Sequence, residues 1–344
     1  MVEYTAPWVE AFPTLRCTGK FNPSTGKYEP ACPHCLYSST TNTQGDISLY
    51  DLKRIGEQFP EAGVESFFIS GGEPLLYFGI DDLIDIYNNL RKETGHPKEI
   101  GLGTNGFWAS SRQAAIQRIK GLAGKGLNFI SVSADIYHAK FKPQTDILQE
   151  VADDYVMGRV DFGLKNKLEF RLQIERETTL VIPLGGGSYL KRKSKLTRPD
   201  TCDIIYDPVD NTRVQRTSEG DYISGLYIFH DGVFACECRS FPLGGLDERL
   251  ISLLEKKSND PLIQFLGRKH NNPRRYLREI TEKLPADFVR ESGILKKPTR
   301  TLGDCDLCTK ITTVPRYEEA LNIARSIASQ RIKNTEDSNY KNRK

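Results

Sequence analysis

Short apolar stretches and amphipathic helices alternate along the first half of this chain, and no other feature constrains the fold as strongly. The apolar stretches lie at 65–70, 98–104, 127–133 and 167–175, and the helical patterns lie at 48–59, 79–93, 110–126 and 145–158. Strands and helices that alternate with short loops are typical of βα units around a parallel sheet. With a first strand near 14–17, about six units fit between residues 12 and 200, fewer than the eight of a full TIM barrel. The pattern predicts an α/β fold, a partial (β/α)6 TIM-like barrel.

The composition of the chain changes near residue 190. A glycine-rich and then basic stretch at 185–200 is typical of a loop or a domain boundary. Beyond it, β-rich runs flank Asp231-Gly232, a strong hairpin signal, and a closing helix is predicted at 315–332. We therefore predict three parts: the barrel over 1–200, an α+β cysteine-rich extension over 201–332 and a disordered tail over 333–344.

Composition also limits the cellular compartment and the classes of partner that we expect for this protein. The net charge of +3 over 344 residues is too small to indicate nucleic acid by itself. No apolar run approaches the ~18 residues of a membrane span, and the N-terminus lacks the basic and apolar regions of a secretory signal. We therefore expect a cytoplasmic protein without a membrane partner. In that reducing compartment, cysteines serve as metal ligands or catalysts more often than as disulfides.

The eight cysteines fall into two groups. Cys17, Cys32 and Cys35 come early, residues 36–201 hold none, and the five late cysteines are Cys202, Cys236, Cys238, Cys305 and Cys308. This spacing indicates two separate metal sites. The motif CPHC at 32–35 fits a zinc clip, a redox dithiol or two ligands of an iron–sulfur cluster, and the pair alone does not decide among them.

A second motif stands where the apolar stretch 65–70 ends. There the chain runs directly into Gly71-Gly72-Glu73-Pro74. In a parallel α/β sheet, functional groups collect where strands end and loops begin. Two glycines let the backbone come close to a ligand, and Glu73 adds a carboxylate. Taken alone, the motif also fits a plain βα turn.

The two motifs in combination resemble the radical S-adenosylmethionine (SAM) superfamily. Thr104-Asn105-Gly106 after the third strand and ISVSADIYH at 130–138 add to the resemblance, which covers roughly residues 12–180. In that family three cysteines hold a [4Fe–4S] cluster and leave one iron open. SAM chelates the open iron, and an electron from the cluster cleaves SAM into methionine and a 5′-deoxyadenosyl radical that abstracts hydrogen from a substrate.

The resemblance assigns roles to particular residues. It implies that Cys17, Cys32 and Cys35 bind the cluster. It implies that the GGEP motif, Gly71, Gly72, Glu73 and Pro74, binds SAM through its amino group, with further SAM contacts from Asn105, Ser131 and Ser133. No catalytic residue beyond the cluster is assigned. Arg171 and Glu175 have suitable chemistry to face SAM or substrate. Tyr137 and His138 either face the substrate or pack at the edge of the core.

The spacing of the early cysteines departs from the family pattern. The family pattern is C-x3-C-x2-C, with three residues between the first two cysteines. In this chain fourteen residues separate Cys17 from Cys32. The insert, TGKFNPSTGKYEPA, is polar and carries turn signals, so we expect a surface excursion, as in some 7-carboxy-7-deazaguanine synthases of the superfamily. Closing a longer loop costs only about 0.6 kcal/mol per doubling of length. His34 either packs beside the cluster or is itself a ligand.

The late cysteines resemble the SPASM/twitch extension of radical SAM enzymes. The run DGVFACECRSFPLGGL and the pair Cys305-x2-Cys308 carry this resemblance. Five cysteines are too few for two fully ligated clusters, so the resemblance implies one auxiliary [4Fe–4S] cluster. Cys305 and Cys308 are its first ligands, Cys236 or Cys238 the next, and Cys202 a fourth. The alternatives are a zinc ion bound by four of these thiolates, or cysteines that bind no metal.

The resemblance therefore predicts a radical SAM enzyme with oxidoreductase- or lyase-type radical chemistry. We expect it to modify a peptide or protein side chain; the alternatives are a small molecule in cofactor or nucleoside biosynthesis, or a non-catalytic zinc-binding α/β protein. The expected partners are an electron donor such as flavodoxin or ferredoxin and, for a peptide substrate, a separate peptide-recognition protein. The basic stretch Lys191-Arg192-Lys193 fits a solvated loop or a contact with an acidic substrate or tRNA.

Overall fold

The structure is a computed structural model. It describes residues 8–24, 26–32, 35, 37–164, 170–175, 215–216, 222–223, 225–235, 239, 242–261, 282–287, 318–319 and 322–330. The elements in chain order are β1 (Trp8–Ala11), β2 (Lys20–Asn22), β3 (Lys27–Glu29), α1 (Leu49–Gly56), α2 (Phe59–Ala62), β4 (Ser66–Ile69), η1 (Pro74–Leu76), α3 (Ile80–Thr94), β5 (Glu99–Thr104), α4 (Arg112–Gly124), β6 (Phe129–Ser133), η2 (Ile136–Phe141), α5 (Lys142–Val156), β7 (Arg171–Glu175), β8 (Gln215–Arg216), β9 (Tyr222–Ile223), β10 (Leu226–Phe229), β11 (Gly232–Phe234), β12 (Pro242–Gly244) and α7 (Leu250–Asn259).

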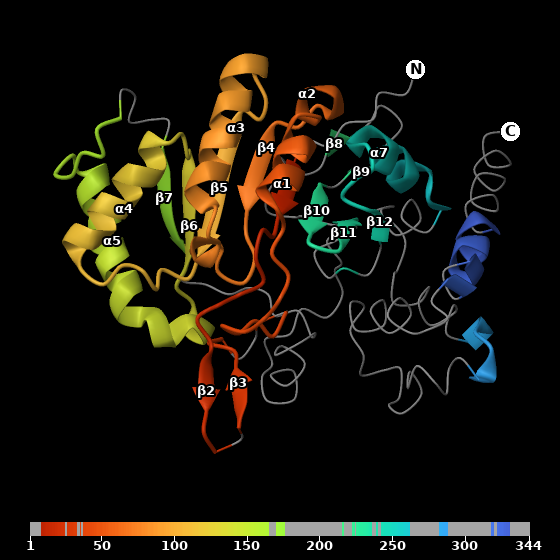
Figure 1. The fold of residues 1–344 in the computed structure, drawn as a ribbon, viewed down its shortest axis with the longest axis horizontal. Coiled ribbons are helices and arrows are strands. Elements are labelled where there is room, and N and C mark those ends of the chain that lie inside the picture. The colour runs from red at the N-terminus through yellow and green to blue at the C-terminus, as the bar shows by residue number, and fades with distance from the viewer. Residues whose placement is uncertain are drawn as a thin grey trace, which may run out of the picture.

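One mixed sheet organises the molecule (Figure 1). Its strand order is β12-β11-β10-β1-β4-β5-β6-β7. The neighbours from β10 to β7 pair in parallel, whereas β10-β11 and β11-β12 pair antiparallel. Helices α1, α3, α4 and α5 connect the parallel strands in the order that βα units require. This open, largely parallel sheet confirms the predicted α/β class and the partial barrel.

Local sequence signals explain where the helices begin. Ser48 caps α1, because its side-chain oxygen accepts a hydrogen bond from the backbone N–H of Asp51. Ser111 caps α4 in the same way through the N–H of Ala114. Helix α3 ends at Gly95, which adopts the left-handed conformation that glycine tolerates best. The strands and helices predicted between 48 and 175 are all present, with shifts of a few residues at their ends.

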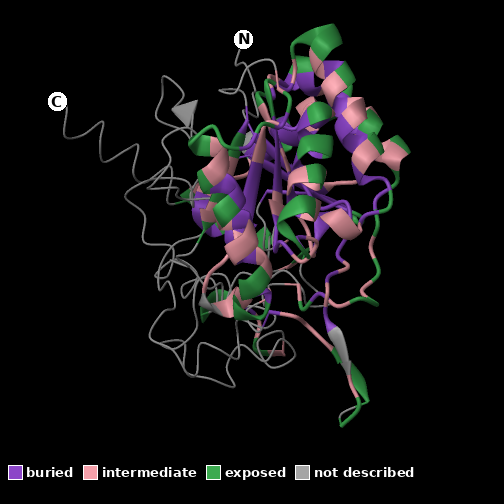
Figure 2. Ribbon diagram, turned by 90° about the vertical axis from the view of Figure 1, so that its left-hand side faces the viewer, coloured by how far each residue is buried: buried purple, intermediate pink, exposed green. Residues whose placement is uncertain are grey.

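The two faces of the sheet pack differently. Alternate strand residues such as Val9 and Phe67 point into the main core, where they meet helix residues such as Leu52 and Leu83. The opposite face carries a separate, mostly aromatic cluster. Its buried members are Trp8, Phe12, Leu15, Tyr227, Phe229 and Phe234. The rings of Phe12 and Phe229 are stacked, with centroids 4.2 Å apart. Figure 2 shows the buried strands in the interior, with the exposed surfaces of the helices turned outward.

One strand lies elsewhere than the sequence predicts, and another makes an additional pairing. A first strand was expected near 14–17, but β1 is Trp8–Ala11, and residues 14–17 belong to the loop after it. Pro13 has no N–H to donate to a ladder, and the side chains of Thr14 and Arg16 bind Asp46 instead. The hairpin predicted at Asp231-Gly232 is confirmed as β10-β11, yet β10 also pairs with β1 and so extends the barrel sheet.

The insert between Cys17 and Cys32 is a two-stranded hairpin of its own. Strands β2 and β3 pair antiparallel and project from the body of the molecule (Figure 1), as expected of a surface excursion. The side-chain amide of Asn22 donates a hydrogen bond to Glu29 across the hairpin at 2.7 Å. Among the described residues, no helix is both long and apolar enough to cross a membrane.

Candidate functional site

The carboxyl ends of the parallel strands form one edge, which we call the carboxyl edge: the last residues of β1, β4, β5, β6 and β7, with the loops after the first four of these strands. Two of these loops are joined by backbone hydrogen bonds. The N–H groups of Ser70, Gly72 and Glu73 donate to the carbonyl oxygens of Ala11, Thr14 and Arg16 at 2.8, 3.1 and 2.7 Å. The GGEP loop therefore continues the pairing of β4 with β1 and holds the backbone that leads to Cys17.

The two glycines of the motif permit this close approach. A Cβ at Gly71, whose φ is +134°, would lie 2.3 Å from the carbonyl oxygen of Thr14. A Cβ at Gly72 would lie 2.3 Å from the carbonyl oxygen of Arg16 and 2.5 Å from that of Leu15. Both obstacles are backbone atoms, so any side chain at these positions would push the loop of Cys17 away. The contact that the structure shows for the glycines is thus with this loop.

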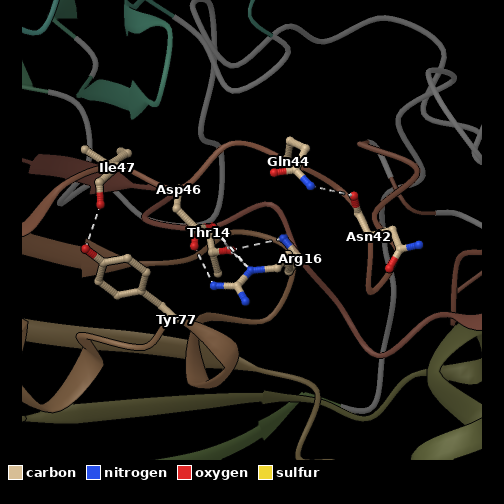
Figure 3. Close-up of polar contacts among 7 residues, drawn as sticks. All are labelled: Thr14, Arg16, Asn42, Gln44, Asp46, Ile47 and Tyr77. Carbon is tan, nitrogen blue, oxygen red and sulfur yellow. Dashed lines mark hydrogen bonds and ion pairs between the residues drawn. The ribbon is translucent and has the colours of Figure 1, made fainter.

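A polar network fixes the same loop from its other side (Figure 3). Thr14 is fully buried, and its hydroxyl donates to Asp46 at 2.5 Å. The guanidinium of Arg16 forms an ion pair with Asp46 at 2.5 Å. Nearby, the hydroxyl of Tyr77 donates to the carbonyl oxygen of Ile47 at 2.6 Å. These contacts connect the residue before Cys17 to the segment that enters α1.

The three early cysteines are free thiols brought to this edge. Cys17 and Cys32 are buried and Cys35 is half-buried. The N–H of Cys17 donates to the carbonyl oxygen of Thr40, and that of Cys35 to the carbonyl oxygen of Cys32. Burial raises the pKa of Cys17 from 9.0 to about 11, with a further rise from the charge of Glu73. Burial also raises the pKa of Cys32, and the charges of Cys17 and Cys35 add to that rise.

Two N–H donors point at these sulfur atoms. The side-chain amide of Asn105 donates to Cys17 Sγ at 3.7 Å, and the backbone N–H of Ser39 donates to Cys35 Sγ at 3.3 Å. The hydroxyl of Ser39 is buried and has no hydrogen-bond partner in the part of the chain that the structure describes. Buried polar groups in proteins are almost always partnered. An acceptor such as a sulfide or thiolate close to Cys35 would satisfy this hydroxyl.

These observations fit a cysteine-ligated iron–sulfur cluster. Such a cluster takes thiolates on separate irons, so the three thiols need not converge on one point. No three His, Cys, Asp or Glu side chains within the described ranges are arranged to hold a single metal ion. The buried thiols are costly to ionise in the bare protein, and a cationic group bound between them would offset that cost. The donor set therefore suits the cluster that the sequence implies.

Glu73 is buried completely, and its carboxylate faces the loop after β5. Its Oε1 accepts hydrogen bonds from Thr104 Oγ1 at 2.9 Å and the N–H of Leu75 at 3.2 Å, and its Oε2 accepts from the N–H of Asn105 at 2.9 Å. Burial raises the pKa of Glu73 from 4.5 to about 7, because the three donors only partly offset the loss of solvent. The carboxylate thus holds the ends of β4 and β5 together.

Ser131 and Ser133 lie on β6 at the same edge, as predicted. Ser131 is buried, and its hydroxyl donates to Glu175 Oε1 on the neighbouring β7 at 2.5 Å. Beyond β6, the ring of His138 is paired with Asp135, with 3.0 Å between Nδ1 and Oδ1 and little exposure of either side chain. Arg171 lies at the opposite end of β7 and pairs with Glu99 at 3.1 Å. The structure thus brings Glu175 to the edge and leaves Arg171 away from it.

Several predicted site residues lie outside the described residues. They are His34, the basic stretch 191–193 and the late cysteines Cys202, Cys236, Cys238, Cys305 and Cys308. Conversely, no motif in the sequence pointed to Thr14, Ser39 or Asp46 as residues of the site. Thr14 and Asp46 are 32 residues apart, and no periodicity or motif connects them. Only the short spacing of Ser39 from Cys35, four residues, would have suggested a link to the cluster.

Comparisons with known proteins agree with this geometry. Residues 29–154 match the model of the radical SAM superfamily. A probable GTP 3′,8-cyclase of Methanothermobacter thermautotrophicus is 26% identical over 140 residues, which are 41% of this chain and 43% of that protein. The chain thus spans less than half the length of this relative.

Two further matches cover more of the chain. The GTP 3′,8-cyclase of Helicobacter pylori strain 26695 is 22% identical over 305 residues, which are 78% of this chain and 90% of that protein. The crystal structure of SuiB from Streptococcus suis is 16% identical and covers 73% of this chain and 66% of its own, with a TM-score of 0.41. The matched range includes Cys32, Cys35 and the glycine-rich loop, and we conclude that this part of the chain is a radical SAM domain.

Proposed function

We propose that this protein is a radical SAM enzyme whose cluster is held by Cys17, Cys32 and Cys35. The observation that carries the proposal is the joining of the Cys17 loop to the Gly71-Gly72-Glu73 loop by backbone hydrogen bonds at the carboxyl edge. When bound, the cluster and SAM supply a 5′-deoxyadenosyl radical, formed with methionine when one electron cleaves the sulfonium, and this radical takes a hydrogen atom from a substrate.

The residues of the chain prepare the site for that chemistry. Burial of Cys17 and Cys32 keeps water from two of the ligands. Gly71, Gly72 and Glu73 stand beside Cys17, where the family resemblance places the amino group of SAM, with Pro74 fixing the turn that follows. Ser131, with Glu175, and Ser133 supply further polar groups two strands away. The amide of Asn105 is directed at Cys17, so its SAM contact rests on the resemblance alone.

For the substrate, we favour a small molecule over a peptide side chain. The support is that the relatives named above are GTP 3′,8-cyclases, enzymes that act on a nucleotide. The peptide substrate that the sequence suggested, and the separate recognition protein that it would need, have no comparable support. The third alternative, a non-catalytic zinc-binding protein, disagrees with the family match.

Two components of the proposal rest on sequence alone. One is an auxiliary [4Fe–4S] cluster, or a zinc ion in its place, held by four of the five late cysteines. The other is an electron donor such as flavodoxin or ferredoxin, which a one-electron cleavage of SAM requires. The predicted division at residue 200 and the SPASM/twitch character of 201–332 likewise remain proposals.

Iron analysis tests the cluster assignment. The protein, reconstituted without oxygen, is compared with a Cys17→Ala, Cys32→Ala, Cys35→Ala variant by iron and sulfide content and by EPR after reduction with dithionite. About eight irons in the wild type and about four in the variant support both clusters, and about four against none supports the early cluster only. Absence of iron from the reconstituted wild type, or equal iron in both proteins, would refute the assignment.

Product analysis tests the activity and the substrate class. With dithionite and SAM, the wild type is expected to release methionine and 5′-deoxyadenosine, and the triple variant to release neither. Addition of GTP is expected to increase 5′-deoxyadenosine release if the substrate is a purine nucleotide. Stimulation by a peptide fraction but not by a panel of nucleotides would reject the small-molecule proposal and leave the radical SAM activity standing.

A further inference from the structure

We propose that Asn105 is a positioning residue that sets the reduction potential of the cluster by donating a hydrogen bond to Cys17 Sγ. The inference rests on the proposed function, since it takes Cys17 to be a cluster ligand. It goes beyond it by giving a side chain outside the cysteine motif control over how readily the cluster accepts an electron.

Both the nitrogen and the oxygen of the Asn105 side-chain amide form hydrogen bonds beside Cys17. It is 5% exposed, so it has almost no contact with solvent. Its amide nitrogen donates to Cys17 Sγ at 3.7 Å and to Thr18 Oγ1 at 3.5 Å, one hydrogen for each acceptor. Its oxygen accepts a hydrogen bond from the N–H of Phe107 at 3.0 Å. This last bond fixes which side of the amide group faces the sulfur.

The backbone of Asn105 is held by the buried Glu73 carboxylate. Glu73 Oε2 accepts from the N–H of Asn105 at 2.9 Å, while Oε1 accepts from Thr104 at 2.9 Å. The N–H of Glu73 in turn donates to the carbonyl oxygen of Arg16, the residue before Cys17, at 2.7 Å. Glu73 therefore binds both Asn105 and the residue before Cys17. These two hydrogen bonds fix the distance between the Asn105 amide and the Cys17 sulfur.

A donor at a cluster thiolate favours the reduced state. Reduction adds a negative charge to the cluster and its sulfurs, and an N–H dipole pointing at a sulfur stabilises that charge. Hydrogen bonds to the sulfurs, with net charge and solvent exposure, are among the factors that set iron–sulfur potentials. The effect is strong where solvent is excluded, because a low local dielectric strengthens the interaction. Removing the amide of Asn105 should therefore make the cluster harder to reduce.

The test compares two variants that affect the same network. Asn105→Ala removes the donor to sulfur, and Asn105→Asp keeps the shape but puts a carboxylate oxygen in place of the NH2 group. The matched control is Thr104→Val, which removes a hydrogen bond from Glu73 and leaves the amide of Asn105 in place. Each protein is reconstituted, its iron is counted, and its reduction is followed by EPR in a redox titration without SAM. The triple cysteine variant supplies the signal of any second cluster for subtraction.

We expect the reduced-to-oxidised ratio at a given potential to fall at least tenfold in Asn105→Ala, a shift of about 59 mV for one electron. Asn105→Asp should shift at least as far in the same direction, and Thr104→Val should match the wild type. An unchanged potential in the Asn105 variants, or an equal shift in Thr104→Val, would overturn the inference. Loss of iron from both Asn105 variants but not from Thr104→Val would also overturn it, and would make Asn105 a requirement for cluster assembly.

The outcome separates this inference from the proposed function. A wild type that binds a cluster at Cys17, Cys32 and Cys35 but does not cleave SAM would refute the proposed activity, while the potentials of the variants would still be measurable. A wild type that cleaves SAM and shares its potential with Asn105→Ala would leave the activity standing and refute the role of Asn105 alone.

Discussion

The two edges of the parallel sheet handle polar groups in opposite ways. At the amino ends of the strands, Lys98 pairs with Glu65 and Arg171 with Glu99, and all four side chains are about half exposed. At the carboxyl edge, by contrast, Glu73 is completely buried and bound by three donors. Exposed ion pairs contribute little to stability because water screens them. Buried and fully bonded groups are costly to disturb, because a broken bond leaves a desolvated charge without a partner.

This difference indicates which edge carries function. A surface ion pair tolerates replacement, so the amino edge places few demands on sequence. The carboxyl edge fixes two loops against each other to within backbone contact, through Gly71, Gly72 and Glu73. Such precision is unnecessary for folding a βα unit, but it is needed to hold thiols for a shared cofactor. The comparison predicts large effects of substitutions at one edge and small effects elsewhere.

The largest effect is expected from Gly72→Ala. Its Cβ would lie 2.3 Å and 2.5 Å from two backbone carbonyl oxygens of the Cys17 loop. Overpacking of this kind costs about 1–3 kcal/mol and occasionally more, and here no flexible side chain can yield. We expect the free energy of unfolding, measured by urea denaturation, to fall by about 3 kcal/mol, and the cluster iron to be lost.

The matched control for Gly72 is Gly121→Ala, inside α4, where a Cβ would meet no atom within 4 Å. Because alanine is the better helix former, this variant should gain about 0.5–1 kcal/mol. Equal stability of the two variants, or iron retained at wild-type level in Gly72→Ala, would show that the two loops can separate without consequence. The comparison of the edges would then lose its main support.

Glu73→Gln should have the next largest effect. An amide at this position must turn its NH2 group toward either the N–H of Asn105 or the N–H of Leu75, so two donors face each other. We expect a loss of about 1–3 kcal/mol in unfolding free energy. Glu99→Gln at the amino edge removes an exposed ion pair and should cost less than about 1 kcal/mol. A smaller loss in Glu73→Gln than in Glu99→Gln would reverse the comparison.

The burial of Glu73 should also make the free energy of unfolding depend on pH. Burial raises the pKa of Glu73 from 4.5 to about 7. Between these values the folded chain binds more protons than the unfolded chain, so the free energy of unfolding falls as the pH rises. The contribution is fully present below pH 4.5 and is lost by about pH 7, with a slope of at most about 1.4 kcal/mol per pH unit.

Urea denaturation of the iron-free protein across this pH range measures the slope. Glu73→Gln cannot titrate, so the difference between wild type and variant isolates the carboxylate from other groups. A difference that stays constant between pH 4.5 and 7, or one that grows in favour of the wild type as the pH rises, would mean that Glu73 is ionised throughout.

The sequence predicted much of this fold because the informative patterns are local. Ser48 and Ser111 cap α1 and α4 through contacts with residues three positions away, and both helices lie within the helical patterns predicted from the sequence. The apolar stretches that became β4, β5 and β6 are short and bounded by turn residues. The family match also confirmed the superfamily that the cysteine and GGEP motifs indicated. These features depend on residues that are close together in the sequence, so they can be found from a single sequence.

The contacts that build the carboxyl edge are long-range, and the sequence did not contain them in readable form. Nothing near Glu73 indicates that its carboxylate faces Asn105, 32 residues away, instead of a ligand. The stacking of Phe12 on Phe229, which accompanies the pairing of β1 with β10, joins residues more than 200 positions apart in the sequence. The position of β1 was missed because the apolar character of 12–17 concealed that Pro13 ends the ladder.

The smallest effect is expected from shortening the β2-β3 hairpin. Paired antiparallel strands lie about 4.8 Å apart, so the two ends of the insert are already neighbours. A Cβ on Gly19 would lie 2.4 Å from the carbonyl oxygen of Glu29, which shows how closely they meet. Replacing residues 20–28 by a two-residue turn should therefore leave Cys17 and Cys32 in place, with normal iron content and a stability change below about 1 kcal/mol.

Such a result would assign the position of Cys17 to the network of Thr14, Asp46 and the GGEP loop and not to loop length. It would also explain how a fourteen-residue spacing can serve a site for which the family uses three. Loss of iron in the shortened protein, at a stability equal to the wild type, would mean that the hairpin itself helps to hold the cluster. The functional site at the carboxyl edge would then include the β2-β3 hairpin, which projects from the body of the molecule.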